Sequence, residues 1–366
     1  MNYLSDHAEI LKCFGTTPIL SCTIRITDKC NLNCIQCYSR SSTDLNSSIL
    51  SISQIKDIFN DLKKHEIMRL SITGGEPFTR PDMMDILELA SDYGFEIYIS
   101  TNGTFCDIDF SRFKSINLKI MQISLDGVGA MHDKIRGHDG AFIKSISFID
   151  KVKSANPAIP IGVAFTLMRE NRNHAIKLYD YLKQTQADVF SVIPVQKIGR
   201  AVDDYALNCF EQKETLEMLA IHYLSSDRII ELNIMVNPAL VPSPLRNLSK
   251  YEHGYLCTFP YSIAIGSDGT LALCDGLLDN NECHWGNICD GISCIFDKDE
   301  VSNILNISSS QIRGVCSLCK FQSMCDGGCR ADAYFAIGDF LASDVMCQQY
   351  FDNGIFPKEL LRFESK

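Results

Sequence analysis

Six short runs rich in β-branched and aromatic residues alternate with amphipathic segments between about residues 18 and 194. The runs are Ser21–Thr27, Met68–Thr73, Glu96–Thr101, Leu118–Leu125, Ile161–Leu167 and Asp188–Ile193. Segments such as Ser53–Glu66 and Phe142–Ala155 repeat apolar residues at helical spacing. Between two of the strand-like runs, Phe110–Ile116 shows this helical spacing only weakly. This alternation predicts an α/β fold with a mostly parallel sheet. Six units favour a partial (β/α)6 TIM-like barrel over a closed one.

The pattern changes after residue 200. A helical stretch, Glu211–Leu224, precedes the proline-bearing segment Asn237–Pro244, which is typical of a linker. Ten cysteines follow between Cys257 and Cys347, so ligand bonds are expected to replace a large apolar core in a small cysteine-rich domain. We therefore expect an N-terminal segment (1–17), the barrel (18–205), a bridging region (206–255), the cysteine-rich domain (256–350) and a tail (351–366).

Composition narrows the class of protein. Of 366 residues, 46% are hydrophobic and 22% charged, which indicates a folded chain. The net charge of −11 argues against partnership with nucleic acid or an anionic membrane. The 17 cysteines occur without a secretory leader or an apolar run of membrane-spanning length, so we expect a cytoplasmic protein whose cysteines serve metal binding or catalysis.

Three cysteines lie in one loop after the first predicted strand, in the pattern Cys30-x3-Cys34-x2-Cys37. An iron–sulfur cube held by three thiolates keeps one iron open to a small molecule, whereas a structural zinc ion takes four ligands. Zinc completed by Cys22 or Cys106 is therefore the alternative reading of this triplet.

The order of the following motifs resembles the radical S-adenosylmethionine (SAM) superfamily. The triplet is followed by Gly74-Gly75-Glu76-Pro77, Ser100-Thr101-Asn102-Gly103, Ser124-Leu125-Asp126-Gly127 and Arg136. The resemblance implies a catalytic 4Fe-4S cluster on the triplet, with SAM chelating its open iron. It also implies SAM contacts from Gly74, Gly75, Glu76, Pro77, Ser100, Asn102, Ser124 and Arg136.

Within this resemblance, glycines let backbone approach the ligand and Glu76 offers a carboxylate to its ammonium group. Arg136 would face the SAM carboxylate, and Ser100 and Asn102 the ribose. The family usually has an aromatic residue before the third cysteine. Here that residue is Gln36, and Tyr38 follows the cysteine.

The C-terminal cysteines resemble the SPASM extension of radical SAM enzymes, which carries two auxiliary 4Fe-4S clusters. The resemblance implies an outer set of Cys316, Cys319, Cys325 and Cys347, and an inner set of Cys257, Cys274 and Cys329. The inner set is one ligand short, because residues 258–273 contain no cysteine. Its fourth corner is therefore open or taken by an unusual ligand, with Cys283, Cys289 and Cys294 as nearby candidates. A zinc knuckle is the alternative.

Asp275 directly follows Cys274, where sulfatase-maturing relatives place a carboxylate that accepts a proton from the substrate. A turn or helix-capping aspartate before Gly276 is an equally good explanation. We carry Asp275 as the candidate catalytic residue.

The implied activity is reductive cleavage of SAM to a 5′-deoxyadenosyl radical that abstracts hydrogen from a substrate C–H bond. Modification of a ribosomal peptide (crosslink, thioether or oxidation) is the leading expectation. Because the first strand begins near residue 20, a separate leader-peptide recognition protein is expected, together with a flavodoxin or ferredoxin as electron donor. A small-molecule dehydrogenase or epimerase, a formylglycine maturase and a non-enzymatic cluster scaffold or electron carrier are the alternatives.

Overall fold

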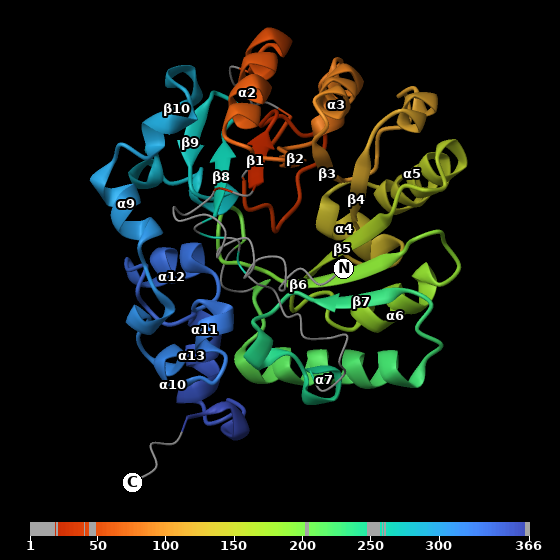
Figure 1. The fold of residues 1–366 in the computed structure, drawn as a ribbon. Helices are drawn as coiled ribbons and strands as arrows, with labels where there is room; N and C mark the ends of the chain where they lie inside the picture. Colours follow the sequence, from red (N-terminus) through yellow and green to blue (C-terminus); the bar gives the residue numbers. More distant parts are fainter. Residues whose placement is uncertain are drawn as a thin grey trace.

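A computed structural model describes residues 19–362 except 20, 40, 44–48, 202–204, 247–256, 258 and 260. In this part of the chain, one ten-stranded sheet has the order β10-β9-β8-β1-β2-β3-β4-β5-β6-β7. The strands form an arc, and α2, α3, α5, α6 and α7 lie on its outer side (Figure 1). Strands β1 to β8 pair in parallel, and only β9 and β10 run antiparallel to their neighbours. The predicted TIM-like α/β architecture is thus confirmed.

All six predicted strands form, within two residues of their expected ends. They are β1 (Ser21–Arg25), β2 (Arg69–Thr73), β3 (Glu96–Thr101), β4 (Leu118–Ser124), β5 (Ile161–Leu167) and β6 (Val189–Pro194). The sequence patterns missed the short strands β7 (Glu231–Ile234), β8 (Ser262–Ile265), β9 (Thr270–Ala272) and β10 (Gly286–Asn287). Strands of two to four residues are too short to display a period of two.

The helices of the barrel follow the expected periodicity. They are α2 (Ile52–Lys64), α3 (Met83–Asp92), α4 (Ala130–Arg136), α5 (Ala141–Ala155), α6 (His174–Leu182) and α7 (Cys209–Ser225). A capping box between Ser51 and Gln54 starts α2 by satisfying its first amides. The segment 110–116, whose helical pattern is weak, forms a short 3-10 helix, Phe110–Lys114.

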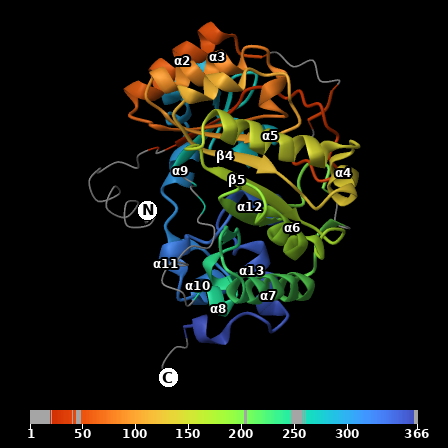
Figure 2. The ribbon, with the colours of Figure 1, turned by 90° about the vertical axis from the view of Figure 1, so that its right-hand side faces the viewer.

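The C-terminal region consists of short helices around the cysteines. These are α8 (Ser243–Arg246), α9 (Asp299–Leu305), α10 (Val315–Leu318), α11 (Gln322–Cys325), α12 (Arg330–Ile337) and α13 (Val345–Asp352). Helix α13 contacts α7, and Figures 1 and 2 both place the two helices close together. The cysteine-rich helices therefore lie beside the end of the arc formed by β6 and β7.

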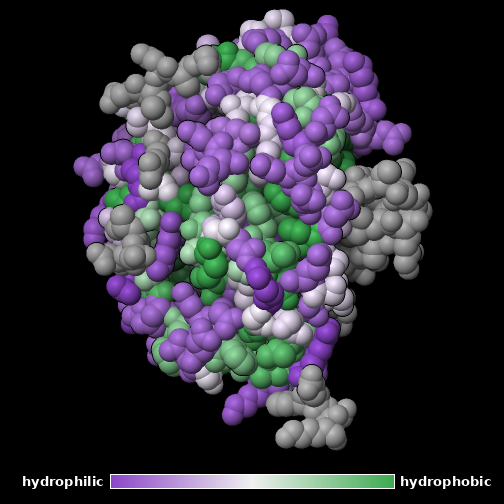
Figure 3. All heavy atoms as spheres, turned by 90° about the vertical axis from the view of Figure 1, so that its left-hand side faces the viewer, coloured by the Kyte–Doolittle hydropathy of each residue, from purple (hydrophilic) through white to green (hydrophobic). Residues whose placement is uncertain are grey.

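Strand β8 ties the two halves of the chain together. Residues Ser262–Ile265 pair with Ser21–Ile24 of β1, so the C-terminal region extends the same sheet. The apolar core runs without interruption from Phe59 of α2 to Leu271 and Tyr350. In Figure 3, apolar side chains also gather in the middle of the face on which α9 and α12 lie. Among the described helices, none combines the length and apolar character needed to cross a bilayer.

Candidate active site

The three cysteines of the N-terminal triplet gather in one small apolar cluster after β1. Cys30 and Cys34 are buried around Leu32, and Cys37 packs against them. Burial raises the pKa of Cys30 to about 12 and also raises the pKa of Cys34. Each thiolate disfavours ionisation of its neighbours, so the three sulfurs become stable anions only beside compensating positive charge. Coordinated metal supplies such charge.

Gly74 and Gly75 hold the loop that leads into the triplet. The Gly75 amide donates to the Thr27 carbonyl at 2.7 Å, and the Glu76 amide donates to the Lys29 carbonyl at 2.9 Å. A Cβ on Gly75 would lie 2.6 Å from the carbonyl carbon of Lys29, closer than real side chains approach backbone. In this structure the missing side chains of Gly74 and Gly75 leave room for the backbone that leads into the cysteine loop. The sequence motif did not suggest this role.

Glu76 is fully buried at the end of β2 and aims its carboxylate at β3. Its two oxygens accept the Thr101 hydroxyl and the Asn102 amide, each at 2.7 Å, and the Phe78 amide at 3.2 Å. Desolvation dominates over these hydrogen bonds and raises the pKa of Glu76 to about 7. A buried carboxylate with this pKa gains stability from a cation, which fits the expected ammonium partner.

Arg136 reaches the triplet from the last turn of α4. Its guanidinium forms an ion pair with the fully buried Asp126 at 2.7 Å and donates to the Cys34 sulfur at 3.8 Å. Gln36 donates to the same Asp126 carboxylate at 2.5 Å. Among the described residues, Arg136 Nε and Gln36 Oε1 are buried polar atoms without a hydrogen-bond partner. Both are available to a polar ligand beside the cysteine cluster.

The remaining expected SAM contacts lie at the carboxyl ends of neighbouring strands. The Asn102 side chain donates to Asn31 at 2.9 Å and lies 4.0 Å from the Cys30 sulfur. Ser100 donates to Gln122 at 3.3 Å, and Ser124 ends β4 in a half-buried position. The structure therefore brings these side chains to the edge of the sheet that also carries the triplet.

Asp275 belongs to a charged network that joins β1 to the C-terminal region. Its carboxylate accepts Arg25 Nε at 2.8 Å and the Tyr38 hydroxyl at 2.5 Å. The Arg25 guanidinium also binds both carboxylate oxygens of Asp279 at 2.8 Å. Because Tyr38 follows Cys37 and Asp275 follows Cys274, this network links the loops that carry the two cysteines.

The four cysteines expected to form the outer set line one small cavity of about 20 Å³. The sulfurs accept hydrogen bonds there: Cys316 from the Ser343 hydroxyl at 3.2 Å and Cys347 from Asn237 Nδ2 at 3.6 Å. The other two members, Cys319 and Cys325, line the same space. Thiolates that share a pocket and accept N–H and O–H donors are typical of cluster ligation.

The inner set is also brought together. Cys257 and Cys329 share a hydrogen bond, which lowers the pKa of Cys257 to about 7 and raises the pKa of Cys329. Burial raises the pKa of Cys274, and the charge of Cys257 adds to the effect.

The three nearby candidates for the missing inner ligand make other contacts. Cys283 is buried in the core beside Glu282, and the Cys294 thiol donates to the Asn287 carbonyl. Cys289 is exposed. None of the contacts recorded for these thiols involves the inner set.

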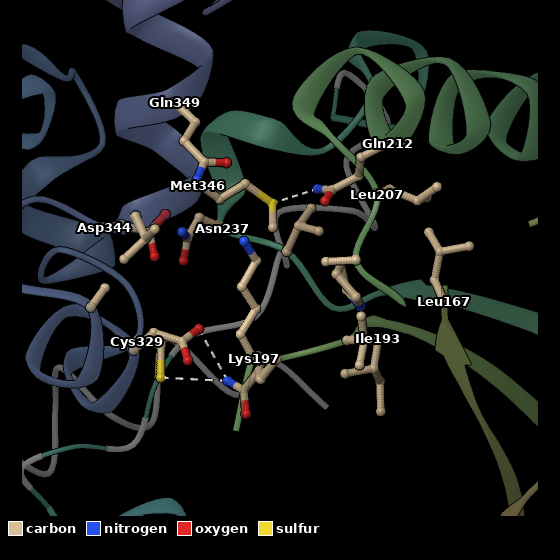
Figure 4. A pocket seen from close by; sticks show the side chains of 18 of the residues that line it. Leu167, Ile193, Lys197, Leu207, Gln212, Asn237, Cys329, Asp344, Met346 and Gln349 are labelled. Carbon is tan, nitrogen blue, oxygen red and sulfur yellow. Dashed lines mark hydrogen bonds between the residues drawn. The ribbon is translucent and has the colours of Figure 1, made fainter. Parts of the chain in front are cut away.

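A cavity of about 520 Å³ separates the carboxyl ends of β5, β6 and β7 from α12 and α13. Cys329, Asn237 and Asp344 lie on one wall, and Leu167 and Ile193 on the other (Figure 4). Asn237 and Asp344 also line the small cavity of the outer cysteines.

One chain segment lines the large cavity and then packs against the loop that carries the cysteine triplet. Ile198 lines the cavity, and the next residues pack against the triplet: the Arg200 amide donates to the Cys37 carbonyl at 2.9 Å. The cavity therefore reaches Cys329 of the inner set and the segment that goes on to pack against Cys37, while none of the triplet cysteines is among its described lining residues.

Several residues of this site were not predicted from the sequence. Arg25 binds Asp275, and Asp126 binds Arg136. Gln36 donates to Asp126, and Asn237 donates to Cys347. Asp126 stood within a recognised motif, but its pairing with Arg136 has no sequence signal. Among the described residues, no three His, Cys, Asp or Glu side chains converge closely enough to hold a single metal ion.

Comparison with known proteins identifies a domain of known type within this chain. Residues 24–182 match the family model of the Radical SAM superfamily. An AdoMet-dependent heme synthase of Methanosarcina barkeri is 24% identical over 342 residues, covering 88% of this chain and 94% of the relative. The mycofactocin maturase MftC of Mycobacterium tuberculosis is 24% identical over 348 residues, covering 92% and 84%.

The fold is shared with solved structures. Streptococcus suis SuiB bound to S-adenosylmethionine superimposes with a TM-score of 0.72 at 17% identity, covering 94% of this chain and 81% of SuiB. SuiB has also been crystallised with its precursor peptide SuiA. At this identity the likeness establishes the architecture.

The barrel is a radical SAM domain, which implies SAM and a 4Fe-4S cluster as its cofactors. The chain is accordingly an enzyme with a radical SAM domain at residues 24–182, followed by a cysteine-rich C-terminal region. The buried triplet, the unpartnered Arg136 Nε and the Glu76 carboxylate fit these cofactors.

Proposed function

We propose that this enzyme cleaves SAM reductively and abstracts a hydrogen atom from a C–H bond of a ribosomal peptide, leaving a crosslinked, thioether-bridged or oxidised product. The observation that carries the proposal is the cavity of about 520 Å³ that reaches from the loop packed on Cys37 to Cys329. A substrate held there lies between the source of the radical and an auxiliary electron acceptor.

The first step depends on groups around the triplet. Cys30, Cys34 and Cys37 bind the catalytic cluster, which together with SAM supplies the radical chemistry. Glu76 binds the ammonium group of SAM, and Arg136, oriented by Asp126 and Gln36, offers its free Nε to the carboxylate.

The same pocket positions the rest of SAM. Ser100, Asn102 and Ser124 complete it from the strand ends, while Gly74, Gly75 and Pro77 fix the backbone of the loop.

The second step requires an outlet for the substrate electron. Cys257, Cys274 and Cys329 bind the inner auxiliary cluster, and Cys316, Cys319, Cys325 and Cys347 bind the outer one, giving three 4Fe-4S clusters with the catalytic one. Asp275 is the candidate acceptor for a substrate proton, although it is not among the described residues that line the large cavity, and its short hydrogen bond to Tyr38 sets its orientation. A flavodoxin or ferredoxin would supply the first electron, and a separate protein would deliver the leader peptide.

A tetrapyrrole is the second candidate substrate, favoured by the similarity to a heme synthase over most of both chains. The cavity argues for the peptide. Among its described lining residues, Lys197 is the one cationic side chain, whereas Asp332 and Asp344 are carboxylates. A heme-type macrocycle carries propionate groups that need cationic partners. A peptide with apolar side chains matches the cavity's leucine, isoleucine and valine walls better.

The test is anaerobic reconstitution followed by reaction with SAM and dithionite. We expect 5′-deoxyadenosine from the parent enzyme and none from the Cys30→Ala/Cys34→Ala/Cys37→Ala variant, while auxiliary iron stays bound. Cys106→Ser is the matched control, since among the described residues the hydrogen bond of this thiol goes to the Thr104 carbonyl. Product from the triple variant, or none from the parent, would overturn the proposal.

The substrate class is tested by adding short peptides encoded beside the gene, or tetrapyrroles, and recording mass changes. Mass loss in a peptide supports the proposed class. Turnover of a tetrapyrrole alone would replace it with the second candidate.

A further inference from the structure

The inner cysteine set lacks one ligand, and the structure places an aspartate beside it. Asp332 stands one helical turn after Cys329, in the first turn of α12. The Cys329 sulfur accepts the backbone amide of Asp332; its hydrogen bond with Cys257 and its burial raise the pKa of that thiol, and the Asp332 charge adds to the effect. The spacing Cys-x2-Asp therefore presents a sulfur and a carboxylate from a single turn, as a Cys-x2-Cys pair presents two sulfurs.

Gln196, in the loop after β6, lies next to both the Cys329 sulfur and the Asp332 carboxylate. Its Nε2 lies 3.8 Å from the Cys329 sulfur and 3.2 Å from Asp332 Oδ2. The Cys329 sulfur and the Asp332 oxygen thus both lie next to the same nitrogen atom. The distance between them is therefore no longer than the sum of their distances to that nitrogen. Both groups are therefore close enough to contact one small polar group at the same time.

Within the part of the chain that the structure describes, the carboxylate of Asp332 has no cationic partner. Among the described residues, no Lys, Arg or His forms an ion pair with it, and its recorded side-chain partner is the neutral Gln196 amide. Asp344 stands nearby and repels it. A half-buried carboxylate that faces another carboxylate gains stability when a positive centre lies against it.

We propose that the Asp332 carboxylate is the fourth ligand of the inner auxiliary cluster, completing the set of Cys257, Cys274 and Cys329. This inference rests on the cluster assignment in the proposed function. An oxygen ligand binds iron less strongly than a thiolate does and exchanges more readily. A carboxylate ligand would therefore exchange for another ligand without breaking an Fe–S(Cys) bond.

The experiment isolates the auxiliary clusters in the full chain. In the Cys30→Ala/Cys34→Ala/Cys37→Ala background, Asp332 is changed to Ala or Cys, and each protein is reconstituted with ⁵⁷Fe. Iron and sulfide counts, Mössbauer spectra, EPR spectra and midpoint potentials are compared. Asp352→Ala is the matched control, because this exposed carboxylate of α13 contacts Gln348 and no cysteine.

Asp332→Ala is expected to leave one iron unprotected, so that mild oxidation removes one iron per chain and produces a three-iron EPR signal absent from the parent. Asp332→Cys is expected to keep all iron, change the EPR spectrum and lower the midpoint potential, because a thiolate donates more electron density than a carboxylate. The Asp352→Ala spectra should match the parent.

Three other outcomes separate the explanations. If Asp332→Ala and Asp332→Cys both leave spectra and potentials unchanged, Asp332 is not a ligand and the inference fails. If they do so while the KM of the otherwise intact enzyme for its substrate rises, the carboxylate binds a substrate cation instead. If the parent background contains a single auxiliary cluster, the cluster assignment of the proposed function fails, whatever Asp332 does.

Discussion

The contact between Gly75 and the cysteine loop allows a quantitative test of how the catalytic cluster is positioned. In Gly75→Ala the new methyl would lie 2.6 Å from the Lys29 carbonyl carbon and 2.8 Å from the Asp28 carbonyl oxygen. Comfortable contacts are about 3.5 Å or longer, so the two segments must separate by roughly 1 Å. Both segments continue directly from paired strands, β1 and β2, which leaves little room for relaxation.

The cost has two sources. Overpacking by one methyl costs about 1–3 kcal/mol, and weakening the Gly75 amide bond to Thr27 adds about 1 kcal/mol. We therefore expect Gly75→Ala to lower the free energy of unfolding by about 2–4 kcal/mol. Because Lys29 precedes Cys30, the displacement also moves Cys30, the first of the proposed cluster ligands.

Gly94→Ala is the matched control. Gly94 has a φ of +73° and its Cβ would meet nothing within 4 Å, so alanine costs about 1–2 kcal/mol of backbone strain without displacing a neighbour. Urea unfolding gives the stability of both variants, and iron counting with 5′-deoxyadenosine formation gives the state of the catalytic cluster.

Gly75→Ala should lose the catalytic iron and SAM cleavage, whereas Gly94→Ala should keep both. The reasoning is refuted if Gly75→Ala is destabilised as expected but retains the iron content and SAM cleavage of the parent.

Two further predictions concern buried charges. Burial raises the pKa of Glu76 from 4.5 to about 7, so the cofactor-free folded chain holds a proton that the unfolded chain releases, and its free energy of unfolding falls by up to about 3 kcal/mol as the pH rises across this window. Glu76→Gln should remove this component, and pH profiles of urea unfolding that stay parallel to the parent would contradict it. Arg25, only 4% exposed, is paired with Asp275 and Asp279, so Arg25→Met should cost about 3 kcal/mol by leaving both carboxylates unpaired. Arg112→Met, which breaks a more exposed network, should cost less than about 1 kcal/mol; equal losses in the two variants would show that burial does not govern the effect.

The long strands and the ligand-bearing loops were predictable because their signals are local. Ile161–Leu167 and Glu96–Thr101 form as expected, since runs of six or seven residues display strand character over their whole length. Glu231–Ile234 was missed: it follows a helix closely and has only four residues. The structure gives it the place beside β6.

The candidate site also has features that the local sequence predicted and features that depend on tertiary contacts. Spacing within one loop predicted that Cys30, Cys34 and Cys37 would cluster, and the structure packs them together. The sequence motif gave Gly74 and Gly75 a role toward a ligand, but it could not indicate that they first make room for Lys29 and Thr27. That contact depends on the parallel pairing of β1 with β2.

Local spacing predicted the kind of chemistry to expect of this enzyme, because thiols a few residues apart and carboxylates after strand ends restrict what one loop can bind. Which loops meet depends on the tertiary structure. Pairing of β8 with β1 brings Asp275 to Arg25 across 250 residues of chain, and the loop after β6 brings Gln196 to Cys329 and Asp332. Such contacts follow from the path of the whole chain around a shared core, and no local pattern of residues specifies that path.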